Sequence, residues 1–413
     1  MSFNLLNQKL NSFINLGTRL GLDSIYALLA ELGSPQDKLQ VVHIGGTNGK
    51  GSTVCYLEYI ALESRVKCGA YTSPALLTFR ENIRVNNKWI TKAQATEGLQ
   101  IIFDACEKIV ASGIAQPTQF EIETALAFWF FAKEQCDIVF LETGLGGALD
   151  ATNVVKQPIC VAFTNIDYDH MNEFGKSLKE IAEAEFGIIK KDVPTYLHVD
   201  QYIDFHHALE AQRIKVGGFN GPFVVHEKYS GKLRSSSVYA AYNAQMAKAI
   251  SLMLGYSKKS IQNGLAKADW FGRFSIVANN PTIILDGAHN TPAIHSLISS
   301  LKKQYRKEKL VFIVGIYKDK DISGMLSAIG KVASKIITVS IDDVIRLQTA
   351  ANLANIANKL CSSIVASSDM THALDLAKAS ATKNDIIVIC GSLSIVAAAA
   401  KELNLLGVDK WIN

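Results

Sequence analysis

The sequence has no paired cysteines, no long apolar segment and no cluster of positive charge. Its seven cysteines are spread singly along the chain, and no two of them form a Cys-x-x-Cys pair. An odd, dispersed set of thiols is not typical of a disulfide framework or a zinc site. We therefore expect reduced cysteines packed in the core of a cytoplasmic protein: Cys55, Cys68, Cys106, Cys136, Cys160, Cys361 and Cys390.

The apolar and charged segments exclude two further classes of protein. The longest apolar run, residues 125–132, is much shorter than the roughly 20 residues that cross a bilayer. The first residues mix Asn, Gln, Lys and Arg with apolar ones, which is not typical of a signal peptide. Lys and Arg number 42 against 38 Asp and Glu, without a basic run. We expect neither a membrane nor a nucleic acid as a partner.

What the chain does contain is enough apolar sequence for two domains. It has 413 residues, of which 48% are hydrophobic, and this length exceeds what one core usually organises. Short apolar runs alternate with helical patterns throughout, which is typical of α/β proteins. We expect strands at 39–44, 69–71, 137–141, 159–163, 195–199, 282–285, 310–314, 335–340, 362–365 and 386–389.

Helices are expected between these strands. Residues 1–38 predict two short helices, the second ended by Pro35. Residues 214–236 read as irregular and strand-like, because glycine and proline interrupt them. The remaining predicted helices are at 52–63, 92–111, from 120 onward, at 201–212 and from 239 onward.

The stretch from His43 to Thr53 is the most informative in the chain. An apolar run precedes it and a helical pattern follows it, so a glycine-rich loop joins a strand to a helix. Such a loop binds phosphate, because glycines let backbone N–H groups turn inward and the helix N-terminus attracts anions. Lys50 is suited to reach the phosphates, and the Ser52 hydroxyl is suited to hold Mg²⁺.

The spacing of this loop differs from the standard pattern of phosphate-binding loops. Gly45 lies four residues before Gly49 instead of five, and Gly51 separates Lys50 from Ser52. On spacing alone, an ordinary glycine-rich turn between strand and helix stays open as an interpretation.

The string Gly46-Thr47-Asn48-Gly49-Lys50-Gly51-Ser52 resembles the ATP loop of the folylpolyglutamate synthase / dihydrofolate synthase family, within the Mur ligase superfamily. Further strings resemble the same family in order along residues 41–396. They include 142–153, 164–170, 181–190, 270–274, 286–290, 315–321 and 391–394.

The resemblance implies a fold and a domain boundary. It implies an α/β protein with a P-loop NTPase-like Mur-ligase domain that binds ATP, over residues 1–270. A smaller Rossmann-like α/β domain that ligates glutamate is implied over residues 271–413. Residues 270–274 resemble the family's hinge between domains.

The resemblance also assigns roles to residues. Those expected to contact ATP are Gly46, Thr47, Asn48, Gly49, Lys50, Gly51, Ser52, Asn243, Arg273 and Asp286. Those expected to hold the metal are Ser52, Ser73, Glu142, His170 and Glu185. Those expected to be catalytic are Lys50, Glu142, His170, Glu185, Arg273, Asp286 and His289. Those expected at the other substrates are Phe120, Asp150, His289 and Ser392.

Several of these residues also have simpler interpretations. Ser73 precedes a proline and suits an ordinary turn, and Phe120 at a helix start suits core packing. His170 at a strand end suits a polar residue with internal partners. Glu142, by contrast, follows a buried strand at the edge where parallel sheets bind ligands.

The sequence departs from the family's pattern at a few positions. Ala75 replaces a histidine, Ala148 replaces an arginine, and Tyr239 and Ala240 replace a histidine and a glutamine. Glu185 stands where the family commonly has a carbamylated lysine. We expect its carboxylate to take the place of the carbamate, and the alternative is a relaxed site with altered chemistry.

The implied reaction is ATP- and Mg²⁺-dependent ligation of L-glutamate to a pterin-linked carboxylate through an acyl phosphate. The acceptor is expected to be dihydropteroate, a reduced folate, or both, and the protein is expected to be a monomer. One alternative is a diverged Mur-family ligase with a different carboxylate and amine. The other is a nucleotide-binding protein that no longer ligates.

Overall fold

A computed structural model describes residues 1–17, 19, 21–175, 177–341, 344, 346–360 and 363–405. The chain divides into two compact units. The first unit contains Met1–Asp167, Met171–Lys232 and Tyr242–Ala268. The second contains Tyr168–His170, Leu233–Ala241 and the chain from Asp269 onward.

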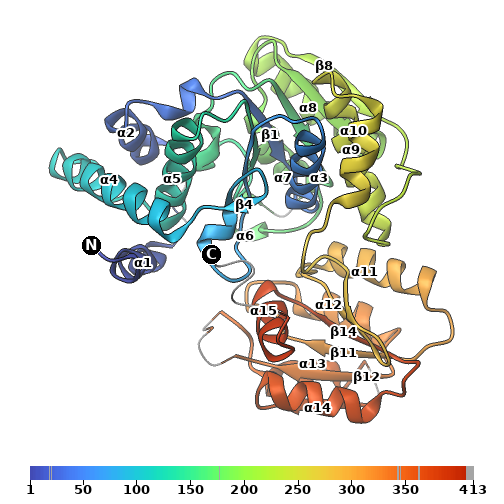
Figure 1. Ribbon diagram of the computed structural model, residues 1–413. Helices are drawn as coiled ribbons and strands as arrows, with labels where there is room; N and C mark the ends of the chain where they lie inside the picture. The colour runs from blue at the N-terminus through green and yellow to red at the C-terminus, as the bar shows by residue number, and fades with distance from the viewer. Residues whose placement is uncertain are drawn as a thin grey trace. The chain divides into compact units, whose positions relative to one another are not determined.

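Within the described residues, the first unit is built on an eight-stranded sheet in the order β4-β3-β2-β5-β1-β6-β7-β8. Figure 1 labels β1, β4 and β8 of this sheet. The strands from β2 to β8 in this order are parallel, whereas β3 and β4 are antiparallel additions at one edge. Parallel strands are covered on both faces, which explains why the central ones are continuous apolar runs. The strands are β1 Val41–Gly45, β2 Cys68–Tyr71, β3 Ile83–Val85, β4 Lys88–Trp89, β5 Ile138–Glu142, β6 Cys160–Phe163, β7 Pro194–His198 and β8 Asn220–Val225.

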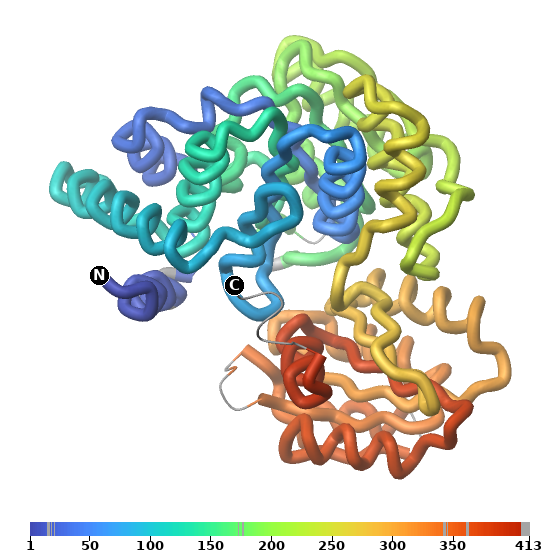
Figure 2. The backbone as a smooth tube through the Cα atoms, viewed as in Figure 1, coloured from blue at the N-terminus to red at the C-terminus, as the bar shows by residue number. Residues whose placement is uncertain are grey.

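Helices cover both faces of this sheet. They are α1 Phe3–Ser12, α2 Asp23–Glu31, α3 Lys50–Glu63, α4 Lys92–Ala111, α5 Gln119–Lys133, α6 Met171–Phe174, α7 Leu178–Glu185, α8 Val199–Val216, α9 Val238–Met253 and α10 Lys258–Lys267. One core lies between the sheet and α1, α2, α4 and α5, with α1 running beside α4 (Figure 2). A second core joins β6 and β7 to α7 and α8.

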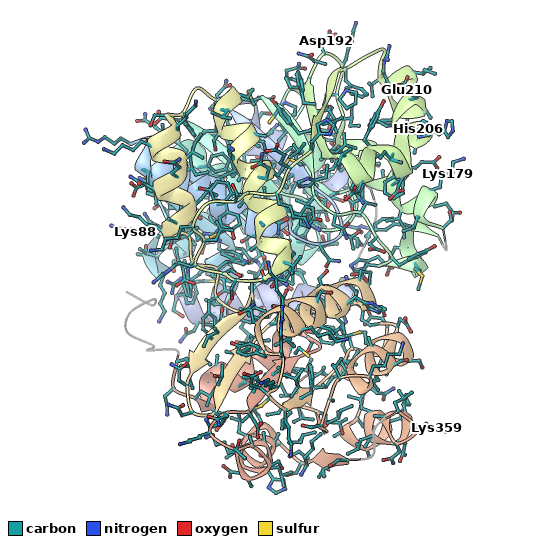
Figure 3. The ribbon with its side chains drawn as sticks, turned by 90° about the vertical axis from the view of Figure 1, so that its right-hand side faces the viewer. Lys88, Lys179, Asp192, His206, Glu210 and Lys359 are labelled. Atoms are coloured by element: carbon teal, nitrogen blue, oxygen red, sulfur yellow. The ribbon has the colours of Figure 1, made fainter. Side chains whose placement is uncertain are left out.

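Local sequence explains where these helices begin and how closely they pack. Thr118 and Glu121 form a capping box at the start of α5, which satisfies two backbone N–H groups. On the other face α10 packs on α3, where a Cβ at Gly264 would come within 2.6 Å of the Cα of Ile60. Polar residues such as His206 and Glu210 are exposed and point outward from α8 (Figure 3).

The second unit is a smaller α/β layer structure. Within the described residues its sheet has six strands in the order β13-β12-β11-β14-β10-β9, all parallel except the edge strand β9. Its core is the buried apolar set around β10, β11, β14, α11 and α12. The strands are β9 Ser275–Ala278, β10 Thr282–Leu285, β11 Leu310–Val314, β12 Lys335–Val339, β13 Ile364–Ser367 and β14 Ile386–Cys390. The helices are α11 Thr291–Gln304, α12 Ile322–Gly330, α13 Ala350–Ala357, α14 Met370–Ser380 and α15 Leu393–Glu402.

These elements confirm the predicted two-domain α/β fold. The predicted strands of both sheets are present within one or two residues of their expected bounds. The prediction of 214–236 as irregular and strand-like is confirmed from 217 onward, where β8 lies between irregular stretches, whereas 214–216 still belong to α8. Strands β3, β4 and β9 were not predicted, and each is short and lies at or beside a sheet edge.

Two expectations from composition can also be compared with the structure. Six of the seven cysteines are buried free thiols, and Cys361 lies outside the described residues. In the described part of the chain, no helix combines the length and the apolar character that crossing a membrane requires.

Candidate functional site

The carboxyl ends of the parallel strands place the predicted phosphate loop beside Glu142. In the sheet, Ile44 of β1 pairs with Glu142 of β5, and Gly45 pairs with Phe163 of β6. The loop after β1 and the last residue of β5 therefore lie at the same edge. This is the edge at which open parallel sheets bind ligands.

Two glycines give the loop its path. Gly46 and Gly49 adopt φ values of 118° and 100°, which side chains rarely tolerate. A Cβ at Gly46 would lie 2.5 Å from Thr164 Oγ1, and one at Gly49 would lie 2.5 Å from Asn243 Oδ1. The loop therefore needs glycine for both conformation and space. Asn243 packs against the start of α3, where its buried Nδ2 has no partner among the described residues.

The loop is tied to the segment that follows β6. The backbone N–H groups of Thr47 and Asn48 donate to the carbonyl of Asn165 at 2.7 and 3.1 Å. The Thr47 hydroxyl donates to the carbonyl of Asp167 at 3.0 Å. These contacts hold the loop in one shape, so its remaining donors are oriented before a ligand arrives.

Lys50 and Glu185 place opposite charges on the loop. Lys50 Nζ donates to the carbonyl of Gly46 at 2.5 Å, so it folds back over the loop. Glu185 is buried, and its Oε2 accepts from Gly46 N at 2.8 Å. Burial raises the pKa of Glu185, and the charge of Lys50 opposes that rise. The carboxylate therefore faces the phosphate loop from the end of α7.

Ser73 and Glu142 meet at the end of β5. Glu142 is 5% exposed, and its Oε2 accepts from the backbone N–H of Ser73 at 3.3 Å. Ser52 lies in the first turn of α3, at the same sheet edge. Hydroxyl and carboxylate oxygens are the ligands that Mg²⁺ prefers, so these groups fit a magnesium site.

The predicted metal ligands stay a prediction. No group of three or more His, Cys, Asp or Glu side chains is arranged to hold a metal ion within the residues that the structure describes. Ser52, Ser73, Glu142 and Glu185 belong to the first unit, whereas His170 belongs to the second.

Phe120 and Asp150 both contact the loop that follows Glu142. The Phe120 ring packs on Gly144, where a Cβ would collide with it, and its centroid is 6.1 Å from that of Tyr71. Asp150 is 4% exposed and accepts from the backbone N–H groups of Gly144 and Leu145 at 2.9 and 2.8 Å. Its carboxylate thus organises the loop that supports Phe120.

In the second unit, Asp286 forms the centre of a buried corner at the end of β10. It is 2% exposed and accepts from Tyr239 Oη at 2.7 Å and from the backbone N–H groups of Phe274 and Ala288, both at 2.8 Å. Burial raises the pKa of Asp286, while the Tyr239 hydrogen bond and the charge of Arg273 oppose that rise. The sequence did not suggest a role for Tyr239.

Arg273 and His289 lie on the same corner. Arg273 Nη1 donates to the carbonyl of Gly287 at 3.4 Å, and His289 Nδ1 lies 2.9 Å from the same oxygen. Ser392 is fully buried and caps α15 by accepting from Ile395 N at 3.3 Å.

Asp169 is a charged centre that sequence reasoning did not select. It accepts from Lys320 Nζ at 2.5 Å and from Asn290 Nδ2 at 2.9 Å, and His289 Nε2 lies 3.5 Å away. Burial alone would raise the pKa of Asp169, but the hydrogen bond from His289 and the charges of His170 and Lys320 hold it well below the ordinary value. The adjacent His170 has a positive φ of 50°, a conformation uncommon outside glycine.

The predicted residues thus fall into two groups, one in each unit. The first unit brings together the loop around Lys50 with Ser73, Glu142, Glu185 and Asn243. The second brings together Arg273, Asp286, His289 and His170. Neither Asp169 nor Lys320 was predicted, although both occur in strings that the sequence analysis had singled out at 164–170 and 315–321.

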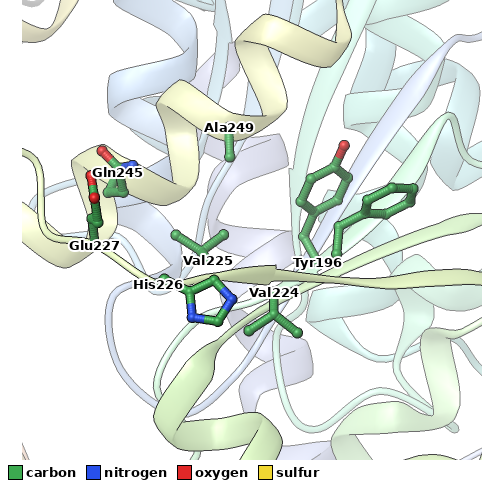
Figure 4. Close-up of a pocket in the computed structure, with 8 residues that line it drawn as sticks. Tyr196, Val224, Val225, His226, Glu227, Gln245 and Ala249 are labelled. Carbon is green, nitrogen blue, oxygen red and sulfur yellow. The ribbon is translucent and has the colours of Figure 1, made fainter.

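A cavity of about 410 Å³ lies elsewhere in the first unit, between β8 and α9. Tyr196 and Val225 point toward the side of α9 that carries Ala249 (Figure 4). The rings of Tyr196 and Phe223 stack at 5.0 Å along its wall. The residues that line it include none of the predicted site residues.

Comparison with known proteins gives matches over most of the chain. The Mur ligase middle domain matches residues 44–220, and the Mur ligase glutamate ligase domain matches residues 272–393. The dihydrofolate synthase/folylpolyglutamate synthase of Bacillus subtilis is 31% identical over 421 residues, covering 94% of this chain and 96% of the relative.

Solved structures give the same result. Escherichia coli FolC in complex with DHPP and ADP superposes with a TM-score of 0.86 at 27% identity, covering 97% of this chain and 98% of that one. The bifunctional folylpolyglutamate synthase/dihydrofolate synthase of Yersinia pestis, complexed with AMPPNP and Mn ion, has a TM-score of 0.84 at 26% identity. That match covers 98% of each chain.

Proposed function

The chain belongs to the folylpolyglutamate synthase/dihydrofolate synthase family of Mur ligases, and we propose that it joins L-glutamate to a pterin-linked carboxylate at the expense of ATP. It is an ATP-dependent acid–amino-acid ligase that forms ADP. The observation that carries the proposal is the glycine loop after β1, with Lys50 above it and Glu142 at the end of the adjacent strand. The substrate is dihydropteroate, a reduced folate, or both.

The reaction has two steps, phosphorylation of the acceptor and formation of the amide bond. An oxygen of the acceptor carboxylate attacks the γ-phosphorus of ATP, which releases ADP and leaves an acyl phosphate. The amino nitrogen of L-glutamate then attacks the acyl carbon, and phosphate and a proton leave. Phosphoryl transfer of this kind depends mostly on positioning and on neutralising charge.

Lys50 neutralises phosphate charge in the first step. In the structure its ammonium contacts the carbonyls of Gly46 and Thr47, and a triphosphate offers a stronger partner. The α3 N-terminus supplies N–H groups to the same ligand. Asn243, with an unpartnered Nδ2 beside Gly49, supports the assignment of a nucleotide contact there.

Mg²⁺ bound beside the loop would neutralise the phosphates and help to polarise the γ-phosphorus. The residues proposed to hold it are Ser52, Ser73, Glu142, Glu185 and His170. Glu185 takes the role of a carbamylated lysine in this proposal. Its support is a carboxylate that faces the loop through Gly46 N.

The second unit provides the remaining groups. Arg273 is proposed to contact ATP phosphates, Asp286 and His289 to contact ATP and glutamate, and Ser392 to contact glutamate. We place the functional boundary at residues 270/271, so that 271–413 form the glutamate-ligase domain. We further propose that the enzyme acts as a monomer in the cytoplasm.

A diverged ligase with another acceptor is the second candidate. Its support is Ala148, which follows the glycine loop after Glu142 where the resemblance leads us to expect arginine. The Ala148 Cβ lies against Gly187. An arginine would make bidentate contacts with an anion that alanine cannot make.

The acceptor decides between these candidates. ADP release is measured with ATP, Mg²⁺ and L-glutamate, with dihydropteroate, tetrahydrofolate or no acceptor. We expect turnover with dihydropteroate and none without an acceptor. Turnover with tetrahydrofolate alone would restrict the enzyme to chain extension. If the protein binds ATP but releases no ADP when either pterin acceptor is added, the folate assignment would be overturned.

A further inference from the structure

A buried hydrogen-bond relay joins the strand of the phosphate loop to the loop beyond Glu142. It starts at His43, which is fully buried on β1, two residues before Gly45. The Nε2 atom of His43 lies 2.8 Å from the hydroxyl of Thr152. The two residues are 109 positions apart in sequence, so the contact links separate elements of the first unit.

The relay continues from Thr152 to Asp150. The Thr152 hydroxyl lies 2.5 Å from Asp150 Oδ1, which also accepts from Thr152 N at 3.0 Å. The other oxygen accepts two further backbone N–H groups, from Gly144 and Leu145. Burial raises the pKa of Asp150, and the hydrogen bonds from Thr152, Leu145 and Gly144 oppose that rise.

The direction of each hydrogen bond follows from counting protons. A threonine hydroxyl has one hydrogen, and both oxygens of Asp150 already accept backbone N–H groups, so the hydroxyl donates to Asp150. His43 must then donate from Nε2 to the Thr152 oxygen. The imidazole is neutral, because burial and the charge of Lys190 lower the pKa of His43 to about 3. Its Nδ1 has no partner among the residues that the structure describes.

The far end of the relay supports an aromatic ring. Asp150 holds the backbone of Gly144, and the Phe120 ring packs directly on Gly144. The Tyr71 ring also contacts Phe120, with its centroid 6.1 Å away. A shift of the 144–145 backbone would therefore move the surface on which the Phe120 ring packs.

We propose that His43 is a positioning residue for the acceptor, acting as a permanent Nε2–H donor that holds Thr152, Asp150 and the Gly144 backbone in place beneath Phe120. The inference rests on the proposed function and on the family resemblance, which implies that Phe120 and Asp150 lie at the acceptor. It predicts that His43 controls acceptor affinity more than ATP affinity.

Three variants separate positioning from general loss of stability. His43→Leu removes the donor at similar size, and His43→Gln restores a donor near the Nε2 position. Thr195→Val is the matched control, because Thr195 is also fully buried in the same sheet and its hydroxyl donates to Val193 O at 3.3 Å, outside the relay. Each variant is purified as the full chain, and KM for ATP, KM for the acceptor and kcat are measured.

We expect His43→Leu to raise the acceptor KM about tenfold, as the loss of one buried hydrogen bond implies. The ATP KM should change less than about twofold, and His43→Gln should recover most of the loss. Equal changes in both KM values, matched by Thr195→Val, would overturn the proposal.

A second measurement does not depend on activity. In ¹⁵N-labelled protein, the imidazole signals of His43 are identified by their absence from the His43→Gln spectrum. We expect a protonated Nε2 and an unprotonated Nδ1 from about pH 6 to 9, whereas an ordinary histidine titrates in the lower part of that range. A proton on Nδ1 would overturn the relay even in an active enzyme. If no pterin acceptor is turned over, the function fails while this spectrum still tests the relay.

Discussion

The loop after β1 and the loop after β10 have the same topology but differ in how the following helix is capped and in the charge of their side chains. Each follows the carboxyl end of a parallel strand and leads into a helix, α3 in one unit and α11 in the other. The N-cap of α3 is Gly49, and no side chain of the described chain caps that helix. The N-cap of α11 is Asn290, whose side chain accepts from Ala293 N at 2.9 Å.

The two loops also differ in their charged residues. The first loop has a cation, Lys50, close to its carbonyls, while Gly46 N contacts the side chain of Glu185. In the second loop the acidic residue is Asp286, which directly follows β10. Its carboxyl group accepts from Phe274 N, before β9, and from Ala288 N of the same loop. A loop that satisfies its own N–H groups holds neighbouring side chains in place. A loop that leaves its helix N-terminus uncapped retains donors for an anion.

The largest effect should come from removing the cation of the first loop. Lys50→Met keeps the length of the side chain and removes the charge that faces phosphate. We expect ADP release to fall on the order of a thousandfold, because one lost charge-stabilising group costs about that much in transition-state stabilisation. The matched control is Lys88→Met, since Lys88 is an exposed lysine on β4 (Figure 3). Near-normal turnover by Lys50→Met would mean that the loop does not bind the reacting phosphates.

Glu185→Gln tests the anion of the first loop. Glutamine retains an oxygen that can accept from Gly46 N but lacks the charge. If Glu185 helps to hold the metal, we expect kcat to fall by about a hundredfold and half-saturation to need more Mg²⁺. Turnover should not respond to added bicarbonate in either protein, because a carboxylate needs no carbamylation. An unchanged Mg²⁺ requirement would limit Glu185 to shaping the loop.

Sequence predicted the central strands well and missed β3, β4 and β9, which lie at or beside sheet edges. The central strands are apolar runs buried on both faces, and such runs need no distant partner to be recognised. Strand β3 contains Arg84, which would suggest a surface segment. Its side chain is 3% exposed because it pairs with Glu58 at 3.0 Å, and nothing in the local pattern reveals that distant partner.

In the candidate site, too, the local sequence does not reveal partners that are distant along the chain. Lys50 and Glu142 could be selected because each directly follows a strand or lies in a recognisable string. The contact of Tyr239 with Asp286 joins residues 47 positions apart, and that of Asn290 with Asp169 joins residues 121 apart. Such polar pairs are created by the fold, so they could not be found from spacing or resemblance.

The smallest effect should come from the cap of the second loop. Asn290→Ala removes the side chain that caps α11 and the amide that donates to Asp169. We expect the free energy of unfolding to fall by about 2 kcal/mol, roughly half from the cap and half from the hydrogen bond. Asn290→Ser restores a capping oxygen without the amide, so it should recover about half of the loss. Urea unfolding of both variants measures these differences. If serine recovers nothing, the cap of α11 contributes little to stability, and the contrast with the uncapped α3 would rest on charge alone.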